Sequence, residues 1–264
     1  MKLYNGNTTI YPSGAVNNTN RDSPLWSASG SKGVFDTFDT TSADEYASWS
    51  PYFFPGTIAF FDFGNPSCYN NAVLTNRNIS LDFSPYNNQF FWSGTPSITT
   101  TNPRYATVGQ VGTLPSIAVG STLGTNFCAG FWLRPNMTRY AVLCATNYNG
   151  GGIEFRRNGD NVGWECYIGS SGRNAAVVFG ISMNVWAYFT WTFDGATFRG
   201  YRNGALVAST NWSGTIANAN TLRVFYGYGD SQYGGDVGLF HFGFAASDAT
   251  ISSYFEATRG RFGV

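Results

Sequence analysis

Two glutamates are the residues of this sequence best placed to do chemistry together. Glu154 and Glu165 lie on either side of Asn158-Gly159-Asp160, a tripeptide typical of a hairpin turn. If strands flank that turn, we expect the two carboxylates to oppose each other on one face. Hydrolysis of a glycosidic bond uses two carboxylates about 5–10 Å apart. A solvated cross-strand pair explains the same spacing, and we favour that interpretation.

The remaining patterns that could support catalysis are incomplete. His241 is the only histidine, and it lies between Phe240 and Phe242 without a Gly-x-Ser-x-Gly motif nearby, which favours a structural role. A lone histidine also makes a metal cluster improbable. Glycines 150–152 predict a turn rather than a phosphate-binding loop, because no Lys-Ser/Thr follows them. We therefore expect no catalytic residues, no enzyme activity and no cofactor.

The cysteines show no Cys-x-x-Cys spacing and lie in apolar, strand-like runs, which favours buried free thiols. They are Cys68, Cys128, Cys144 and Cys166. Disulfides stay open at this point, since four cysteines allow three pairings.

One aromatic and polar cluster is suited to ligand binding. It follows a predicted strand and comprises Tyr226, Tyr228, Asp230, Gln232 and Tyr233. Aromatic faces with nearby amide and carboxylate groups are typical of sugar sites, so we predict a carbohydrate site here. An ordinary aromatic loop or a subunit contact is the alternative. Asp230 and Asp236 are oxygen donors for calcium, but their spacing matches no EF-hand loop, so no metal site is predicted.

The composition points to a protein with contacts to other proteins. Only 11% of the 264 residues are charged, well below the ~25% usual in soluble domains, and aromatic residues reach 18%. Lys2 and Lys32 are the only lysines, and interfaces deplete lysine while favouring arginine and aromatic residues. Genomic composition bias is the alternative explanation. Zero net charge without a basic stripe excludes an electrostatic nucleic-acid surface. We see no signal peptide and no apolar run long enough to cross a membrane.

Short strands and turns must position these groups. The predicted strands are Thr57–Phe63, Asn126–Leu133, Tyr140–Ala145, Gly152–Arg156, Val162–Ile168, Asn174–Phe179, Trp186–Phe193, Phe198–Arg202, Ala205–Ser209, Leu222–Tyr226 and Val237–Phe244. Turns at Asp194-Gly195 and Asn203-Gly204 predict an antiparallel meander. A short helix is expected to begin at Ser247 or Asp248. Many short strands between turns indicate an all-β sandwich or barrel over residues 56–264.

Residues 1–55 lack this periodicity and are rich in Asn, Ser, Thr and Gly, a composition that cannot build its own core. Their apolar islands are Leu25, Trp26, Val34, Phe35, Tyr52, Phe53 and Phe54. We predict an extended N-terminal arm that makes assembly contacts through these islands. A flexible tail is the alternative.

Four segments, in order, resemble the laminin-G-like, concanavalin A-like jelly-roll domains of phage and other viral structural proteins. They are Phe60–Tyr69, Asn126–Pro135, Trp186–Val207 and Ser247–Phe262. Asp194-Gly195 and Asn203-Gly204 carry the third match. The sequence departs at Leu239-Phe240-His241, where many relatives carry an acidic residue, and this weakens any transfer of ligand chemistry.

The resemblance implies an antiparallel concanavalin-like jelly-roll sandwich in a non-enzymatic virion structural protein. A capsid decoration, spike or fibre subunit of a bacteriophage is expected. It would assemble in the host cytoplasm with other virion proteins or with itself as a homo-oligomer, and would bind neither nucleic acid nor membrane. Binding of a host glycan is compatible with this role. A lectin-like carbohydrate-binding module outside a virion is the alternative.

Overall fold

The chain divides into two compact units, Met1–Phe53 and Phe54–Val264. The computed structural model describes residues 3–5, 8–10, 57–64, 68, 79–81, 89–92, 97–99, 105–108, 112–114, 126–136, 141–145, 153–157, 163–168, 175–180, 182–213, 222–225 and 233–264. In the first unit, β1 (Leu3–Asn5) pairs with β2 (Thr8–Ile10) as an antiparallel ladder. The predicted assembly residues Leu25, Trp26, Val34, Phe35, Tyr52, Phe53 and Phe54 lie outside the described residues.

The second unit contains two eight-stranded sheets. One sheet has the order β16-β15-β14-β9-β18-β7-β6, with β3 also paired to β18. Its strands are β3 (Thr57–Asp62), β6 (Ser97–Thr99), β7 (Tyr105–Val108), β9 (Phe127–Pro135), β14 (Ala187–Phe193), β15 (Thr197–Arg202), β16 (Ala205–Asn211) and β18 (Gly235–Gly243). Every strand pair recorded in it is antiparallel.

The second sheet has the order β13-β12-β11-β10-β17-β8-β5-β4. Its strands are β4 (Ile79–Leu81), β5 (Gln89–Trp92), β8 (Gly112–Leu114), β10 (Ala141–Ala145), β11 (Ile153–Arg157), β12 (Gly163–Ile168), β13 (Ala175–Gly180) and β17 (Leu222–Val224). The predicted all-β sandwich is therefore confirmed. Strands β4 to β8 were not predicted, because three or four residues are too few to show a period of two.

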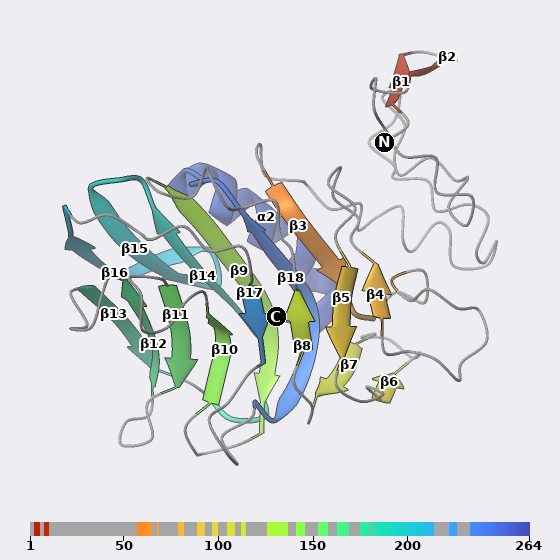
Figure 1. Cartoon of the computed structure of the whole chain (residues 1–264), viewed down its shortest axis with the longest axis horizontal. Helices are drawn as coiled ribbons and strands as arrows, with labels where there is room; N and C mark the ends of the chain where they lie inside the picture. The colour runs from red at the N-terminus through yellow and green to blue at the C-terminus, as the bar shows by residue number, and fades with distance from the viewer. Residues whose placement is uncertain are drawn as a thin grey trace. The chain divides into compact units, whose positions relative to one another are not determined.

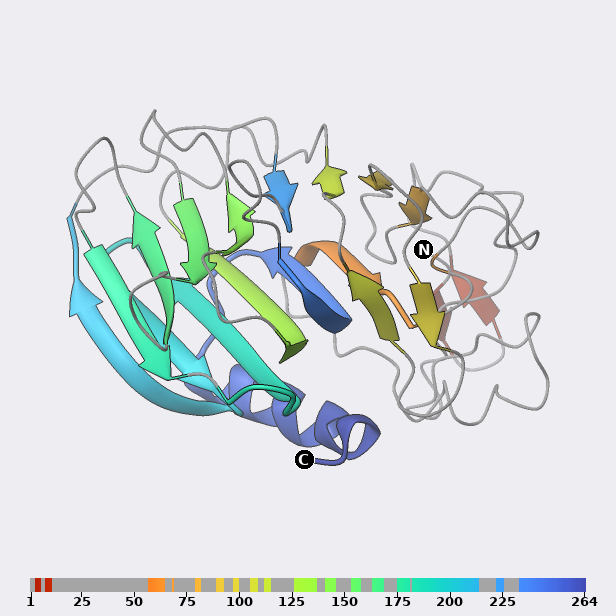
Figure 2. The same ribbon diagram turned by 90° about the horizontal axis from the view of Figure 1, so that it is seen from below.

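The core between the two sheets is aromatic. Phe131 of β9 stacks on Phe240 of β18 with ring centroids 4.8 Å apart, and Phe155 of β11 lies 4.9 Å from Trp191 of β14. Phe127 contacts Phe155 at 5.9 Å. Since Phe155 belongs to the second sheet and the others to the first, these rings hold the two layers face to face (Figures 1 and 2). The alternation predicted for Phe127 and Phe131 is confirmed.

One helix, α2 (Asp248–Phe262), covers the outer face of the first sheet (Figures 1 and 2). We call the first sheet, the one that contains β9, β14 and β18, the helix-covered sheet. Ser247 caps the helix by accepting the N–H of Thr250 at 3.2 Å, as predicted. The helix is longer than the short one expected, because buried residues recur along one side. They are Ile251, Tyr254, Phe255, Thr258, Arg261 and Phe262.

Trp132 of β9 is the main contact of this helix with the sheet. Its ring stacks on Phe262 at 4.3 Å and on Phe255 at 5.8 Å, and its indole N–H donates to Thr258 Oγ1 at 2.9 Å. Arg261 also makes a buried, bidentate ion pair with Asp62 of β3, at 2.7 and 2.8 Å. The helix therefore explains why β9 is buried on both faces rather than on alternate residues only.

The two predicted Asx-Gly turns are confirmed. Gly195, Asn203 and Gly204 adopt positive φ angles of 95°, 52° and 76°. Residues of this type tolerate the left-handed region that tight hairpins require. These turns join β14, β15 and β16 into the expected meander.

Candidate functional site

The predicted sugar-binding cluster is only partly described. Tyr226, Tyr228, Asp230 and Gln232 lie outside the described residues, so their role stays a prediction. Tyr233 is fully buried. Its ring lies 5.5 Å from Phe225 and 6.1 Å from Trp164, and its hydroxyl donates to the carbonyl of Asp236 at 3.2 Å.

Tyr233 is therefore a core residue, and the expectation that its ring offers a stacking surface to a sugar is corrected. Burial raises the pKa of its hydroxyl. Its hydroxyl can be buried without a large cost because the carbonyl of Asp236, at the start of β18, accepts its hydrogen bond.

Glu154 and Glu165 do not oppose each other directly. The ladder between β11 and β12 pairs Arg156 with Glu165 and Glu154 with Tyr167, so the two glutamates are diagonal neighbours on one face. Arg156 contacts both carboxylates, at 3.7 Å to Glu154 and 3.6 Å to Glu165.

All three side chains of this cluster are buried, with 5%, 3% and 3% of the surface of Glu154, Arg156 and Glu165 exposed. The expectation of a solvated pair is therefore wrong. A glycosidic bond would have to lie between the two carboxylates, and the guanidinium of Arg156 occupies that position. The arrangement suits a structural ion cluster across the hairpin better than an acid and a nucleophile.

His241 is fully enclosed beneath α2. Its Nε2 atom is hydrogen-bonded to the hydroxyl of Tyr188 at 2.5 Å, and its ring meets Tyr254 edge-on at 5.3 Å. Burial lowers its pKa from 6.5 to about 3, so the imidazole is neutral at ordinary pH. Gly130 of β9 faces this ring, and a Cβ at that position would overlap His241 Nε2. These contacts agree with a structural histidine.

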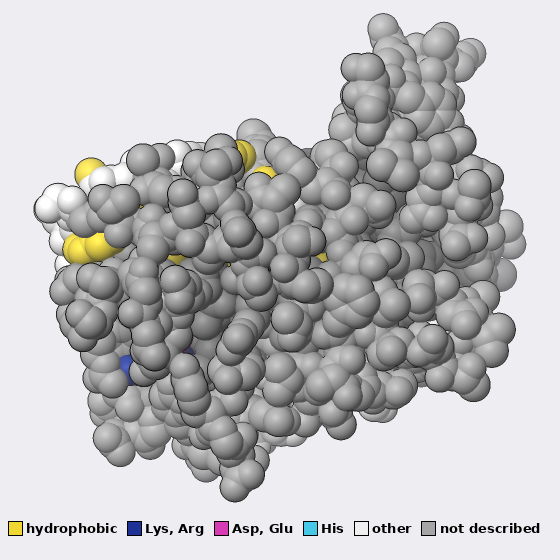
Figure 3. All heavy atoms as spheres, in the orientation of Figure 1, with side chains coloured by type: hydrophobic (Ala, Val, Ile, Leu, Met, Phe, Trp, Pro, Cys, Tyr) yellow, Lys and Arg dark blue, Asp and Glu magenta, His cyan; other side chains and the backbone are white. Residues whose placement is uncertain are grey.

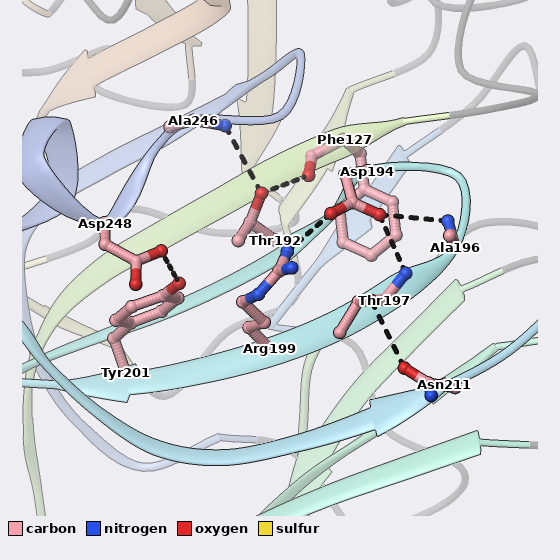
Figure 4. A network of polar contacts seen from close by, with 10 residues as sticks. All are labelled: Phe127, Thr192, Asp194, Ala196, Thr197, Arg199, Tyr201, Asn211, Ala246 and Asp248. Atoms are coloured by element: carbon pink, nitrogen blue, oxygen red, sulfur yellow. Dashed lines mark hydrogen bonds and ion pairs between the residues drawn. The ribbon is translucent and has the colours of Figure 1, made fainter.

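The turn at Asp194 forms a polar network on the surface of the same sheet (Figure 4). Asp194 accepts the N–H groups of Ala196 and Thr197 at 2.9 and 2.7 Å, and Arg199 donates to it at 2.6 Å. Partial burial would raise the pKa of Asp194, but the Thr197 N–H, Arg199 and the Ala196 N–H lower it to about 2. Both oxygens of this carboxylate accept bonds from the turn or from the strand that follows it, which makes Asp194 a turn-capping residue.

A second polar group lies on the helix-covered sheet and was not predicted from the sequence. Cross-strand pairing aligns Ser97 of β6 with Thr107 of β7, Thr107 with Asp236 of β18, and Asp236 with Arg134 of β9. We call these four residues the polar row. Directly paired residues point to the same face of a sheet, so the row crosses four neighbouring strands on the side where α2 lies.

The contacts within the polar row are short and specific. Arg134 donates to Asp236 Oδ2 through Nε at 2.6 Å, and Thr107 donates to Asp236 Oδ1 at 2.6 Å. Arg134 Nη2 also donates to the hydroxyl of Tyr105 at 2.9 Å. Burial lowers the pKa of Arg134, but Asp236 and Tyr105 together raise it further, so the guanidinium stays charged.

Two aromatic rings flank this arginine. Its guanidinium carbon lies 4.9 Å from the centroid of Tyr105 and 5.5 Å from that of Trp186, and the two rings meet edge-on at 5.5 Å. Trp186 is almost fully buried, whereas Tyr105 is half-buried. One third of the Arg134 side chain remains exposed.

The sequence carried no signal for this group. Tyr105, Arg134, Trp186 and Asp236 are far apart along the chain, and only strand register brings them together. From the sequence, Asp236 stands out only as an oxygen donor for calcium. In the part of the chain that the structure describes, no group of three His, Cys, Asp or Glu side chains is arranged to hold a metal ion.

Two further observations concern described residues only. Cys128 is a free thiol whose pKa burial raises, and Cys68 and Cys166 are buried as well. No helix among the described segments has both the length and the apolar character needed to cross a membrane.

Comparison with known proteins supports the same fold. The family model described as the concanavalin A-like lectin/glucanases superfamily matches residues 106–242, just over half of the chain. A search of curated proteins finds no match.

Solved structures of similar fold include botulinum neurotoxin binding domains. The binding domain of serotype G aligns with a TM-score of 0.60, 15% identity, and coverage of 76% of this chain and 50% of that one. The binding domain of botulinum neurotoxin DC in complex with rat synaptotagmin II aligns with a TM-score of 0.61 and 14% identity, and the alignment covers 76% of this chain and 52% of that one. A structure of botulinum neurotoxin type C, whose cell entry depends on interaction with two ganglioside molecules, aligns with a TM-score of 0.58 and 13% identity, and the alignment covers 76% of this chain and 51% of that one. The chain thus spans about half the length of these structures.

Proposed function

Because this chain belongs to the concanavalin A-like lectin/glucanase superfamily, we propose that it is a non-catalytic, carbohydrate-binding jelly-roll protein. The superfamily name covers both binding and hydrolysis, so the choice between them rests on the site. Function depends on the site rather than on the fold alone.

The position of Arg156 carries this choice. A glycosidase needs an open space between its two carboxylates for the bond that breaks. Here the buried guanidinium of Arg156 contacts both Glu154 and Glu165, at 3.7 and 3.6 Å. Botulinum neurotoxin type C, which has a similar fold, interacts with gangliosides, and this supports glycan binding as the function of the present chain.

A glycan array probed with the full chain tests the proposal. We expect binding to a defined subset of glycans, with no reducing ends released when the bound glycans are incubated with the protein. Release of sugar that is lost in Glu154→Gln or Glu165→Gln would contradict it and would indicate a hydrolase. Absence of binding across a broad array would also contradict it.

A virion structural role is the second candidate, and the separate unit Met1–Phe53 favours it. The resemblance to phage structural domains and the scarcity of lysine support an assembly function, with the N-terminal unit joining neighbouring virion proteins or copies of the chain. On this proposal the protein is a capsid decoration, spike or fibre subunit, and glycan binding serves the virion.

Deletion of residues 1–55 tests that role. We expect the shortened protein to fold and to keep glycan binding but to lose its association with partner proteins or with itself, as measured by light scattering and co-sedimentation. Normal assembly of the deleted form would contradict the anchoring role without affecting the carbohydrate proposal.

A further inference from the structure

We propose that the polar row, together with Tyr105, is the carbohydrate site, and that it takes an uncharged, hydroxyl-rich pyranose. This inference rests on the carbohydrate-binding function proposed above and names its place and ligand class. The row lies on the helix-covered sheet, and none of its members belongs to the predicted cluster at residues 226–233.

The first argument is that Arg134 is already held in place. Asp236 and Tyr105 bind its Nε and Nη2 atoms, and its guanidinium carbon lies 4.9 and 5.5 Å from the ring centroids of Tyr105 and Trp186. A side chain fixed in this way loses little conformational entropy when it binds a ligand. Its remaining nitrogen, Nη1, has no partner among the described residues, and one third of the side chain is exposed. The arginine therefore offers rigid donors to solvent.

The second argument concerns charge. Arg134 and Asp236 are the only charged members of the polar row, and their formal charges cancel. An anionic sugar would be attracted by Arg134 and repelled by Asp236, whereas a neutral sugar meets donors and acceptors without that conflict. The hydroxyls of Ser97 and Thr107, both on exposed residues, add groups that donate and accept. Alternating donors and acceptors suit the vicinal hydroxyls of a pyranose.

The third argument is the aromatic surface. A sugar site combines a few well-placed polar groups with an apolar face. The half-buried ring of Tyr105 supplies that face beside the row. The ring of Tyr105 packs edge-on against Trp186, and the ring of Trp186 lies 4.7 Å from that of Phe262 in α2. The helix therefore supports the position of Tyr105 through Trp186.

The chain offers a matched comparison within the same sheet. Asp194 and Arg199 form an ion pair of the same length, 2.6 Å, with side-chain exposure of 40% and 29%. No described aromatic ring stacks on Arg199, and Asp194 is engaged by its own turn (Figure 4). The pair of Asp194 and Arg199 therefore has the same two charges as the polar row but no described aromatic ring beside its arginine. Substitution of Arg199 serves as the control for substitution of Arg134.

The test measures binding of the full chain to lactose, maltose and cellobiose, with sialyllactose as the acidic probe, by calorimetry at low and high salt. Among the neutral sugars at least one should bind, with little dependence on salt. Arg134→Lys and Tyr105→Ala should each weaken that binding about tenfold or more, because the first removes the planar guanidinium with its fixed N–H groups and the second removes the apolar face. Arg199→Lys should change it less than about twofold. Thr107→Val gives a milder variant if either substitution unfolds the protein.

Each other outcome overturns the inference in a distinguishable way. Unchanged binding in folded Arg134→Lys, Tyr105→Ala and Thr107→Val would place the site elsewhere, and loss on Tyr228→Ala would assign it to the loop. Carbohydrate binding as such would then survive. Binding of sialyllactose alone, weakened by salt, would overturn the neutral ligand class. Absence of any carbohydrate binding would overturn both proposals. Melting curves of each variant show whether the fold is retained.

Discussion

At the scale of single residues, two glycines leave room for neighbouring rings because they lack a side chain. Gly130 allows His241 and Tyr188 to meet beneath α2, and Gly238 allows Phe262 to lie against β18. A Cβ at either position would overlap a ring. The sequence shows these glycines inside strand patterns, where glycine indicates a close approach of another group. Which group approaches is visible only in the structure.

Substitution of Gly130 by alanine should lower the free energy of unfolding by about 1–3 kcal/mol, because the new methyl group forces His241 or Tyr188 to move. Gly260 is the control, since nothing lies within 4 Å of a Cβ built there and it belongs to α2. Gly260→Ala should stabilise the protein by about 0.5–1 kcal/mol through helix propensity. Urea unfolding of both variants measures the difference, and equal effects would contradict the packing described.

His241 should make the protein less stable in acid. Its pKa is lowered from 6.5 to about 3 on folding, so between these values the unfolded chain binds a proton that the folded chain does not. Stability from this residue is therefore full above pH 6.5 and is lost as the pH falls, by up to about 1.4 kcal/mol per pH unit. Unfolding of His241→Gln at several pH values should show a shallower dependence than the parent chain. Identical slopes would show that His241 is accessible to protons when folded.

At the scale of secondary structure, α2 is held to the sheet by two kinds of contact. Trp132 provides the apolar one, stacked between Phe255 and Phe262. Asp62 and Arg261 provide the polar one, and they join the first and last elements of the sandwich. The sequence predicted the start of this helix from its cap, but its length depends on the sheet that buries its apolar side.

Substitution of Asp62 by asparagine should cost about 3–5 kcal/mol of stability, because Arg261 is buried and would lose its carboxylate. The exposed pair between Glu256 and Arg259 on the same helix is the control. Glu256→Gln should change the free energy of unfolding by less than about 1 kcal/mol. Thermal and urea unfolding compare the two. A small effect at Asp62 would indicate that water reaches Arg261.

Two of the three large apolar residues that are exposed in the described part of the chain lie on β16. Leu206 and Val207 of β16 are each 49% exposed, and described hydrophobic side chains are visible on the side of the molecule where β16 lies (Figure 3). β16 ends the order of the helix-covered sheet, so one of its edges carries no partner strand among the described ones. A β-bulge opposite Gly200 and Tyr201 distorts this strand, a feature that discourages edge-to-edge pairing.

For the molecule as a whole, local patterns in the sequence were enough to predict the fold class and the longer elements. Alternating apolar residues, Asx-Gly turns and a serine cap are local signals, since each depends on neighbours within a few residues. They predicted the strands around Phe127 and Trp191, the turn at Asp194 and the start of α2. Absence of a complete catalytic pattern also favoured binding over catalysis.

Contacts between residues far apart in the sequence could not be predicted in this way, because they depend on how the strands pair and pack. Whether Glu165 faces Glu154 or Arg156 depends on a register shift of two residues, and the polar row exists because four strands align Ser97, Thr107, Asp236 and Arg134. Tyr233 lies inside the molecule because of packing that no local pattern predicted. Register and burial follow from the free energy of the assembled sheets, which is why the candidate site emerged from the structure and not from the sequence.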